Sequence, residues 1–141
     1  MSLEEWKSAT DILANLAILV AGVWGLYTYS KAKKLDRAKW LKDLYEKFYE
    51  KPDLKVVRNT IDEGDESKIN KYVTREPSEF TDYLNFFEFI GHLREQKQIS
   101  NEEVIGLFDY YLRSLKKPVV LKYVQDKSHG YEKLASLLEE L

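Results

Sequence analysis

Residues 12 to 29 form the longest apolar segment of the chain, and this segment stands close to the N-terminus. No charged side chain occurs from Ile12 to Ser30, and three lysines then fall within the next four positions. A helix on the surface of a soluble protein carries charges on its outward face, whereas this segment carries none. As a helix it would be about 27 Å long, close to the roughly 30 Å hydrocarbon core of a bilayer. The pattern therefore predicts a membrane-spanning helix.

Aromatic residues flank both ends of this predicted span. Trp6 precedes it, and three rings close it, namely Trp24, Tyr27 and Tyr29. Such rings settle at membrane interfaces because each has an apolar body and a polar tip. We therefore assign residues 1–30 to a transmembrane helix. Two alternatives stay open: a buried helix of a soluble protein, and a cleaved signal peptide, which the acidic leader and the bulky residues after the span disfavour.

The segment that follows, residues 31–42, is strongly basic. It holds six basic residues and one acidic residue, a net charge of +5. Because Lys and Arg close to a span are retained in the cytoplasm, we expect a single-pass inner-membrane protein with its N-terminus outside and its C-terminal body in the cytoplasm. The same segment can attract anionic lipid headgroups, and the candidate contacts are Lys31, Lys33, Lys34 and Arg37. Its simpler role is that of a retention signal without a ligand.

Small residues recur every four positions in the predicted span, at Ala17, Ala21 and Gly25. On a helix this spacing makes a flat stripe that lets two backbones approach closely. We therefore expect the chain to form homo-oligomers through this stripe. The alternative is that alanine and glycine are simply frequent in membrane helices.

Residues 43–141 have the periodicity of a compact all-α bundle. After the basic segment, apolar and aromatic residues recur at spacings of three and four, and no helix breaker separates them from the span. A continuous helix from about Trp6 to Tyr49 is predicted, and Pro52 ends it. Further helices are expected over about 53–63, near 69–73 and over 79–98, the last being the central helix of the core.

The C-terminal third of the chain predicts shorter helices. Ser100 and Glu103 have the spacing of a capping box, which opens a helix that we expect Pro118 to stop. Val119 to Val124 fit either a strand or a helix, and helix is favoured because no partner strand is evident elsewhere. A last amphipathic helix is expected over 131–141. The fold class is therefore all-α, with one N-terminal transmembrane helix followed by a cytoplasmic helical bundle.

Composition and charge narrow the possible partners. The chain has no cysteine, which excludes disulfides, a thiol nucleophile and cysteine-based metal sites. Residues 43–141 carry a net charge of −5, whereas binding to a nucleic acid duplex needs a basic face that displaces counterions from phosphate. We expect the membrane as a partner, a protein or a small anionic ligand as a further one, and no nucleic acid duplex.

The sequence shows no catalytic constellation, so we expect neither an enzyme nor a cofactor. It lacks a glycine-rich phosphate loop, a nucleophile elbow and a paired-histidine zinc motif, and its acidic residues do not form a metal-ligand spacing. His92 and His129 stand far apart and are expected to be structural. Asn85 and Glu88 lie three apart on the aromatic helix and, with Arg94 or Arg58 near, are candidates for a pocket. Their alternative role is that of structural hydrogen bonds.

Residues 40–65 and 79–112 resemble a family of small bacterial proteins of unknown function. The resemblance rests on the run EFTDYLNFFEFIGHLREQKQISNEEVIGLFDYYL and on its Tyr-Leu-Asn-Phe-Phe-Glu motif, which here is Tyr83, Leu84, Asn85, Phe86, Phe87 and Glu88. Members combine an N-terminal membrane helix with a compact helical domain. The resemblance implies this fold and this anchorage, but it implies no activity.

Three function classes follow from these patterns. The first is a membrane-anchored interaction module that self-associates or binds a cytoplasmic partner. The second is a ligand-gated membrane effector, whose body senses a nucleotide-type signal and perturbs the membrane through an oligomeric helix bundle. The third, an enzyme acting on lipid or phosphate, ranks last because no catalytic residues support it.

Overall fold

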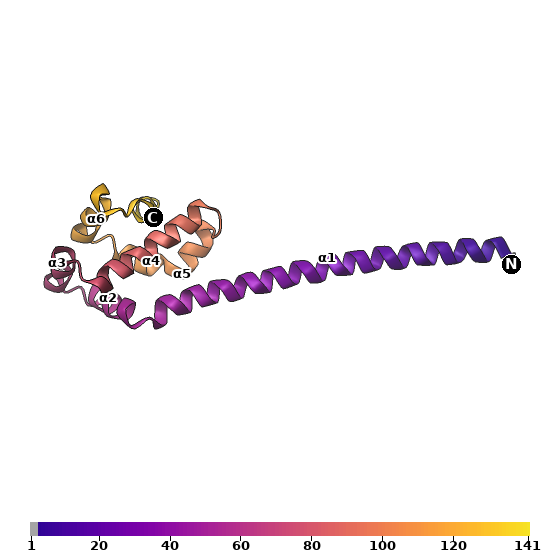
Figure 1. Cartoon of the computed structure of the whole chain (residues 1–141), viewed down its shortest axis with the longest axis horizontal. Helices are drawn as coiled ribbons and strands as arrows, with labels where there is room; N and C mark the ends of the chain where they lie inside the picture. The colour runs from indigo at the N-terminus through magenta and orange to yellow at the C-terminus, as the bar shows by residue number, and fades with distance from the viewer. Residues whose placement is uncertain (1–2) are drawn as a thin grey trace. The chain divides into compact units, whose positions relative to one another are not determined.

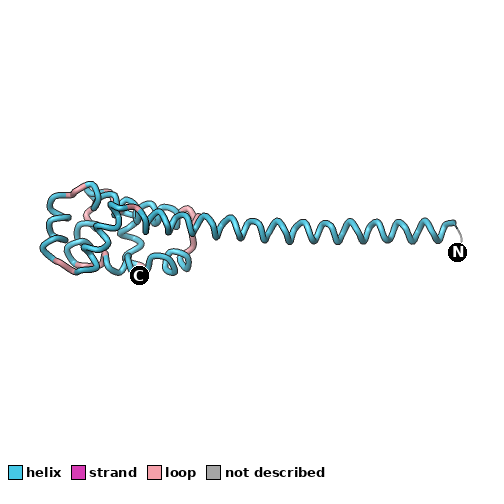
Figure 2. The backbone as a smooth tube through the Cα atoms, turned by 90° about the horizontal axis from the view of Figure 1, so that it is seen from below, coloured by secondary structure: helices cyan, strands magenta, loops and turns pink. Residues whose placement is uncertain are grey.

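The computed structural model describes residues 3–141, and all regular structure in that range is helical (Figure 2). Residues 1 and 2, the start of the segment 1–30 that the sequence assigns to the membrane, lie outside the described residues. Seven α-helices follow one another in these 139 residues, with one short 3-10 helix at Lys127–His129 before the last of them. The α-helices are α1 (Leu3–Glu50), α2 (Pro52–Glu63), α3 (Glu66–Arg75), α4 (Ser78–Glu95), α5 (Asn101–Ser114), α6 (Pro118–Gln125) and α7 (Glu132–Glu139).

Helix α1 runs without interruption from Leu3 to Glu50, which confirms the predicted continuous helix (Figure 1). It is long and apolar enough to cross a membrane, since an 18-residue window within it has a mean hydropathy of 1.7 and none of that window is buried. The chain divides into two compact units, residues 1–44 and residues 45–141. The last six residues of α1 therefore belong to the second unit, which is called the body below.

The helix boundaries in the body follow from the residues that the sequence places there. Pro52 is the first residue of α2, where its missing N–H costs nothing. Gly64 ends α2 in a left-handed conformation with φ of 68°, which glycine adopts without strain. The capping box of α5 is confirmed, because the Ser100 hydroxyl accepts from the Glu103 N–H and the Glu103 carboxylate accepts from the Ser100 N–H.

Two sequence-based boundaries change in the structure. Helix α5 ends at Ser114, three residues before the Lys117 N-cap of the next helix, so Pro118 does not stop α5 but opens α6 at its first position. Residues 119–124 lie inside α6, which settles the choice between strand and helix. Helix α4 ends at Glu95 rather than at residue 98, and Lys97 adopts a positive φ of 56° in the turn that follows.

The centre of the body is a cluster of aromatic rings around Phe48. This side chain comes from the last turn of α1 and is fully buried. Its ring centroid lies 4.9 Å from that of Tyr111 and 5.0 Å from that of Phe86. Three further rings lie within 6 Å of it, those of Tyr83, Phe87 and Phe108. The C-terminal turn of α1 is therefore part of the hydrophobic core of the body.

Replacing Phe48 by alanine should lower the free energy of unfolding of the body by about 3–5 kcal/mol, because a large cavity would form among rings that cannot collapse into it. Chemical unfolding of the full chain in detergent, followed by near-UV circular dichroism, measures this loss. Phe89→Ala is the matched control, because Phe89 is 49% exposed on α4 and its removal should cost less than about 1 kcal/mol. Equal losses in the two variants would mean that the core is not centred on Phe48.

Candidate functional site

Glu88, one of the three residues that the sequence marks as pocket candidates, holds the N-terminal end of α7. Its two carboxylate oxygens accept the backbone N–H groups of Lys133, at 3.0 Å, and Leu134, at 2.7 Å. These groups belong to the first turn of α7, whose N-cap Tyr131 supplies no side-chain hydrogen bond. A carboxylate at this end also interacts favourably with the helix dipole. Glu88 therefore acts as an N-cap that comes from another helix.

Arg94 holds the opposite end of the same helix. Its Nη1 and Nη2 donate to the carboxylate of Glu140, at 2.6 and 3.1 Å, and Glu140 directly follows α7. The Arg94 side chain is 14% exposed and that of Glu140 is 54% exposed, so the cation of this two-pronged contact is largely buried while its anion faces water. A second ion pair, between Lys133 and Glu95 at 2.7 Å, joins the two helices nearer the start of α7.

Gly91 allows α4 and α7 to approach each other this closely. A Cβ atom built on Gly91 would lie 2.8 Å from the backbone oxygen of Lys133, which is closer than such contacts occur. Gly91 stands between Glu88 and Arg94 on α4. The stretch from Glu88 to Arg94 thus provides a capping carboxylate, a flat contact point and a cation, each used to dock α7.

Asn85 does not belong to this arrangement. It is exposed on α4, whereas Glu88 is half-buried and Arg94 is directed at Glu140. Of the three candidates, Arg94 lines the pocket described in the next paragraph, and Asn85 and Glu88 do not. Glu88 has the alternative role, that of forming structural hydrogen bonds. Residue spacing alone did not reveal this, because the N–H groups that donate to Glu88 belong to a helix about 45 residues further along the chain.

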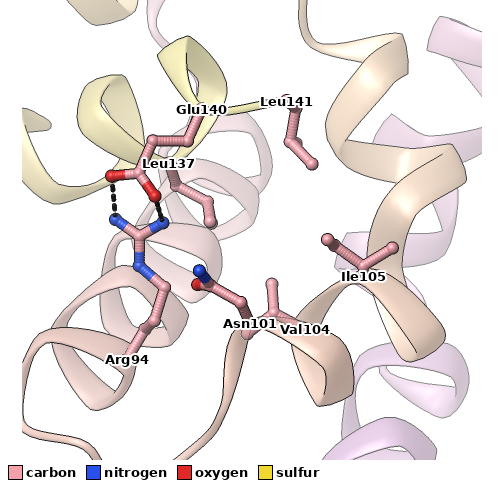
Figure 3. Close-up of a pocket in the computed structure, with 7 residues that line it drawn as sticks. All are labelled: Arg94, Asn101, Val104, Ile105, Leu137, Glu140 and Leu141. Atoms are coloured by element: carbon pink, nitrogen blue, oxygen red, sulfur yellow. Dashed lines mark hydrogen bonds and ion pairs between the residues drawn. The ribbon is translucent and has the colours of Figure 1, made fainter.

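The pocket beside Arg94 is small. It lies between α4, α5 and the end of the chain, with a cavity volume of about 40 Å³ (Figure 3). Figure 3 shows the Arg94 guanidinium facing the Glu140 carboxylate at its edge. This volume holds one or two water molecules and not a nucleotide. The lining residues are Arg94, Asn101, Val104, Ile105, Leu137, Glu140 and Leu141.

Arg58 is a buried cation, which the sequence indicated only as a residue that could lie near the predicted pocket. It lies on α2 with 5% of its surface exposed. Its guanidinium stands 4.2 Å from the ring centre of Tyr49 and 5.6 Å from that of Phe48, and its Nη1 donates to the Tyr49 carbonyl at 3.5 Å. A cation at this point interacts favourably with both the aromatic faces and the C-terminal end of α1. No local sequence motif signals such a contact, because its partners are brought together by packing.

Tyrosines near this cation are held in their neutral form. Burial is the main reason why the pKa of Tyr83 is raised, and Asp62 adds to the effect. Burial likewise raises the pKa of Tyr111, with Tyr45 as a second cause. These hydroxyl groups therefore remain hydrogen-bond donors over the physiological range.

His129 is a structural residue at the junction of α3, α6 and the 3-10 helix. Its ring stacks on Tyr123 with centroids 3.9 Å apart, and its Nδ1 lies 2.8 Å from the Tyr123 carbonyl oxygen. The Tyr123 hydroxyl donates to Glu76 at 2.8 Å, and burial together with this bond raises the pKa of Tyr123. His92, in contrast, is exposed on α4. Within residues 3–141, no three His, Asp or Glu side chains gather as metal ligands.

The candidate residues of the N-terminal unit lie along α1. Ala17, Ala21 and Gly25 are exposed, and a Cβ added to Gly25 would meet nothing within 4 Å. The rings that follow remain exposed as well, and Trp24 and Tyr27 contact each other with centroids 6.3 Å apart. The Nζ atom of Lys33 lies 4.9 Å from the ring centre of Tyr29. Lys31, Lys34 and Arg37 are exposed on the same segment.

The structure thus defines an all-α protein with one candidate membrane-spanning helix and a helical body. No protein-family model, curated protein or solved structure matches the chain. The resemblance to small bacterial membrane-anchored proteins therefore stays a prediction from the sequence.

Replacing Glu88 by alanine should lower the free energy of unfolding by about 1–3 kcal/mol, because two N–H groups of α7 would lose their acceptor. Asn85→Ala is the matched control, since Asn85 is exposed three residues away and its loss should cost less than about 0.5 kcal/mol. Urea unfolding of the two full-length variants measures the difference. If Asn85→Ala were the more damaging of the two, the two side chains would have the reverse of the roles assigned to them here.

Proposed function

We propose that this chain is a single-pass, membrane-anchored helical interaction module, which self-associates or binds a cytoplasmic partner at the inner membrane of a bacterial cell. One observation carries the proposal. The apolar window of α1 has no buried residue, and side chains such as Ile18 and Leu26 are 68% and 71% exposed. A soluble chain rarely leaves so long an apolar surface uncovered, because water disfavours it. Lipid supplies the missing cover.

The distribution of charge supports an orientation. Of the seven basic residues among positions 1–42, six follow the apolar window, whereas Lys7 precedes it together with Glu4 and Asp11. Positive residues resist translocation, so the body stays in the cytoplasm and the short N-terminus lies outside.

Several polar groups of the body serve its own packing. Glu88 and Arg94 dock α7, Arg58 lies against the end of α1, and Tyr123 and His129 hold each other beside Glu76. Each of these side chains is committed to a partner within the fold. A catalytic site needs titratable groups that are free to reach a substrate.

The stripe of Ala17, Ala21 and Gly25 supports self-association through α1. These residues turn by about 40° for every four positions and so remain on one side of the helix. Their small side chains let a second copy approach until the backbones are in van der Waals contact.

Gly25→Leu should weaken self-association by about tenfold, because a leucine side chain would hold two helices apart at the stripe. Quantitative cross-linking of the full chain in isolated membranes, over a range of expression levels, measures the effect. The same preparation tests location, since the chain should sediment with membranes and leave them only with detergent. A fluorescent reporter at Leu141 should light up in the cytoplasm.

Val23→Leu is the control for this experiment. Val23 is 68% exposed and stands two residues from Gly25, on the far side of the helix, so its replacement should leave the cross-linked fraction unchanged. A chain that stayed in the supernatant without detergent would refute the anchorage. Equal cross-linking of wild type and Gly25→Leu would refute the stripe.

A second function, that of a ligand-gated membrane effector, is favoured by the path of α1. The helix has no break between the apolar window and Phe48, and Phe48 is fully buried in the core of the body. A ligand that binds one packing of this core more tightly than another would shift α1 as well. The pocket beside Arg94 is too small for a nucleotide as it stands, so a nucleotide-type signal would have to open the body.

This second function predicts that a nucleotide alters membrane permeability. Vesicles that contain the full chain and a trapped dye should leak when the active nucleotide of a panel is added, and Phe48→Ala should abolish the response by uncoupling α1 from the core. Phe89→Ala should retain it. Vesicles that stayed sealed with every nucleotide would leave the interaction module as the function.

A further inference from the structure

The first lysines after the apolar window have ammonium groups without protein partners. Within residues 3–141, those of Lys31 and Lys34 form no ion pair or hydrogen bond, and Lys33 contacts only the ring of Tyr29. Some basic residues of the body, in contrast, are paired. Arg113 pairs with Asp109 at 2.8 Å, one helical turn away, and Lys133 pairs with Glu95 at 2.7 Å. The lysines next to the span therefore have their charges available for an outside anion.

The spacing of these cations is unfavourable for a helix in water. Lys31 and Lys34 are three residues apart, so two like charges lie side by side on the helix surface. Such a pair costs a few tenths of a kcal/mol when nothing stands between the charges. An anion that bridges neighbouring cations removes this cost.

The position of Lys33 fixes the depth at which that anion would bind. Helix side chains lean toward the N-terminus, and the Lys33 Nζ accordingly lies 4.9 Å from the ring centre of Tyr29, back toward the apolar window. Lys31 to Lys34 span about 4.5 Å of the helix axis. The headgroup layer on one side of a bilayer is about 5–7 Å thick. Three cations and the last aromatic ring of the span thus fall within one headgroup layer.

The three lysines also surround the helix rather than occupying one face. At about 100° per residue, Lys31 and Lys34 lie about 60° apart, whereas Lys33 lies about 100° from Lys34 and about 160° from Lys31. This arrangement does not suit a single flat partner. It suits several small anions arranged around the helix, as lipid headgroups are.

We propose that Lys31, Lys33 and Lys34 form a collar that binds the phosphate groups of anionic lipids in the leaflet next to the body. The inference rests on the proposed function in one respect, that the apolar window lies in a bilayer. The collar also compensates for the negative charge of the body. Residues 43–141 carry a net charge of −5 and are repelled by an anionic leaflet, and the +5 of residues 31–42 offsets this repulsion at the point of attachment.

Trp24 provides a probe for the lipids around the collar. It lies seven residues before Lys31, about 10 Å along the axis, and so within reach of acyl chains. The full chain with Trp6→Phe and Trp40→Phe retains Trp24 as its only tryptophan. It is reconstituted into phosphatidylcholine vesicles in which either brominated phosphatidylglycerol or brominated phosphatidylcholine quenches its fluorescence.

The anionic lipid should quench Trp24 with a preference of about fivefold or more at low salt, since each lysine near the surface attracts anionic lipid by about 1 kcal/mol. The preference should fall toward one in 0.5 M salt, where charges are screened within about 4 Å. Inorganic phosphate and chloride at equal ionic strength should lower it equally. If phosphate were clearly the stronger competitor, the collar would be a site for the free anion and the proposal would be wrong.

Two triple variants complete the test. Lys31→Gln with Lys33→Gln and Lys34→Gln should reduce the preference to about one. Lys71→Gln with Lys116→Gln and Lys122→Gln removes the same charge from exposed positions of the body and should leave the preference unchanged. If both brominated lipids quench the wild type equally, or if the first variant keeps the preference, the collar is refuted while the anchorage stands. If neither lipid quenches Trp24, the span is not in lipid, and the proposed function itself is wrong.

Discussion

Phe48 lies in the last turn of the long N-terminal helix, and its ring is fully buried among five others. Edge-to-face ring pairs contribute beyond the area they bury, so this residue holds α1, α4 and α5 to a common centre. Arg58 adds a cation against the rings of Phe48 and Tyr49 and against the carbonyl end of the helix. The end of an apolar helix is thereby made part of the core of a charged body. In the proposed effector function, a signal along α1 would pass through this contact.

The polar residues of α4 also serve packing, because they hold α7 in place. Glu88, Gly91 and Arg94 follow one another along the side of the helix that meets α7, and they supply an acceptor, a close approach and a donor. Helix α7 has only eight residues, too few to be stable alone in water. Its buried side chains, Leu134, Leu137 and Leu138, provide apolar packing. The Glu88 carboxylate at its N-terminal end adds to this by complementing the helix dipole. Polar groups set among aromatic residues thus serve packing here.

Several features of the fold were predictable from local sequence because their causes are local. Pro52 and Gly64 act on their own backbone, and the capping box at Ser100 and Glu103 involves residues of one turn. The limits of this reasoning appear at Pro118, which the sequence assigned to the end of one helix and the structure assigns to the start of the next. Proline at a first helical position and proline after a helix have the same local signature. In the structure, residues 115–117 separate the end of α5 from Pro118, so this proline opens α6.

The sequence by itself determined the apolar helix, the basic segment after it and the all-helical character of the body, since each depends on residue type and periodicity along one stretch of chain. The tertiary structure alone decided what Asn85, Glu88 and Arg94 do. Residue spacing placed Asn85 and Glu88 together, yet one is exposed and the other accepts hydrogen bonds from Lys133 and Leu134. Helical periodicity tells which residues share a face, but the partner of that face comes from a distant part of the chain. Only packing brings the two together.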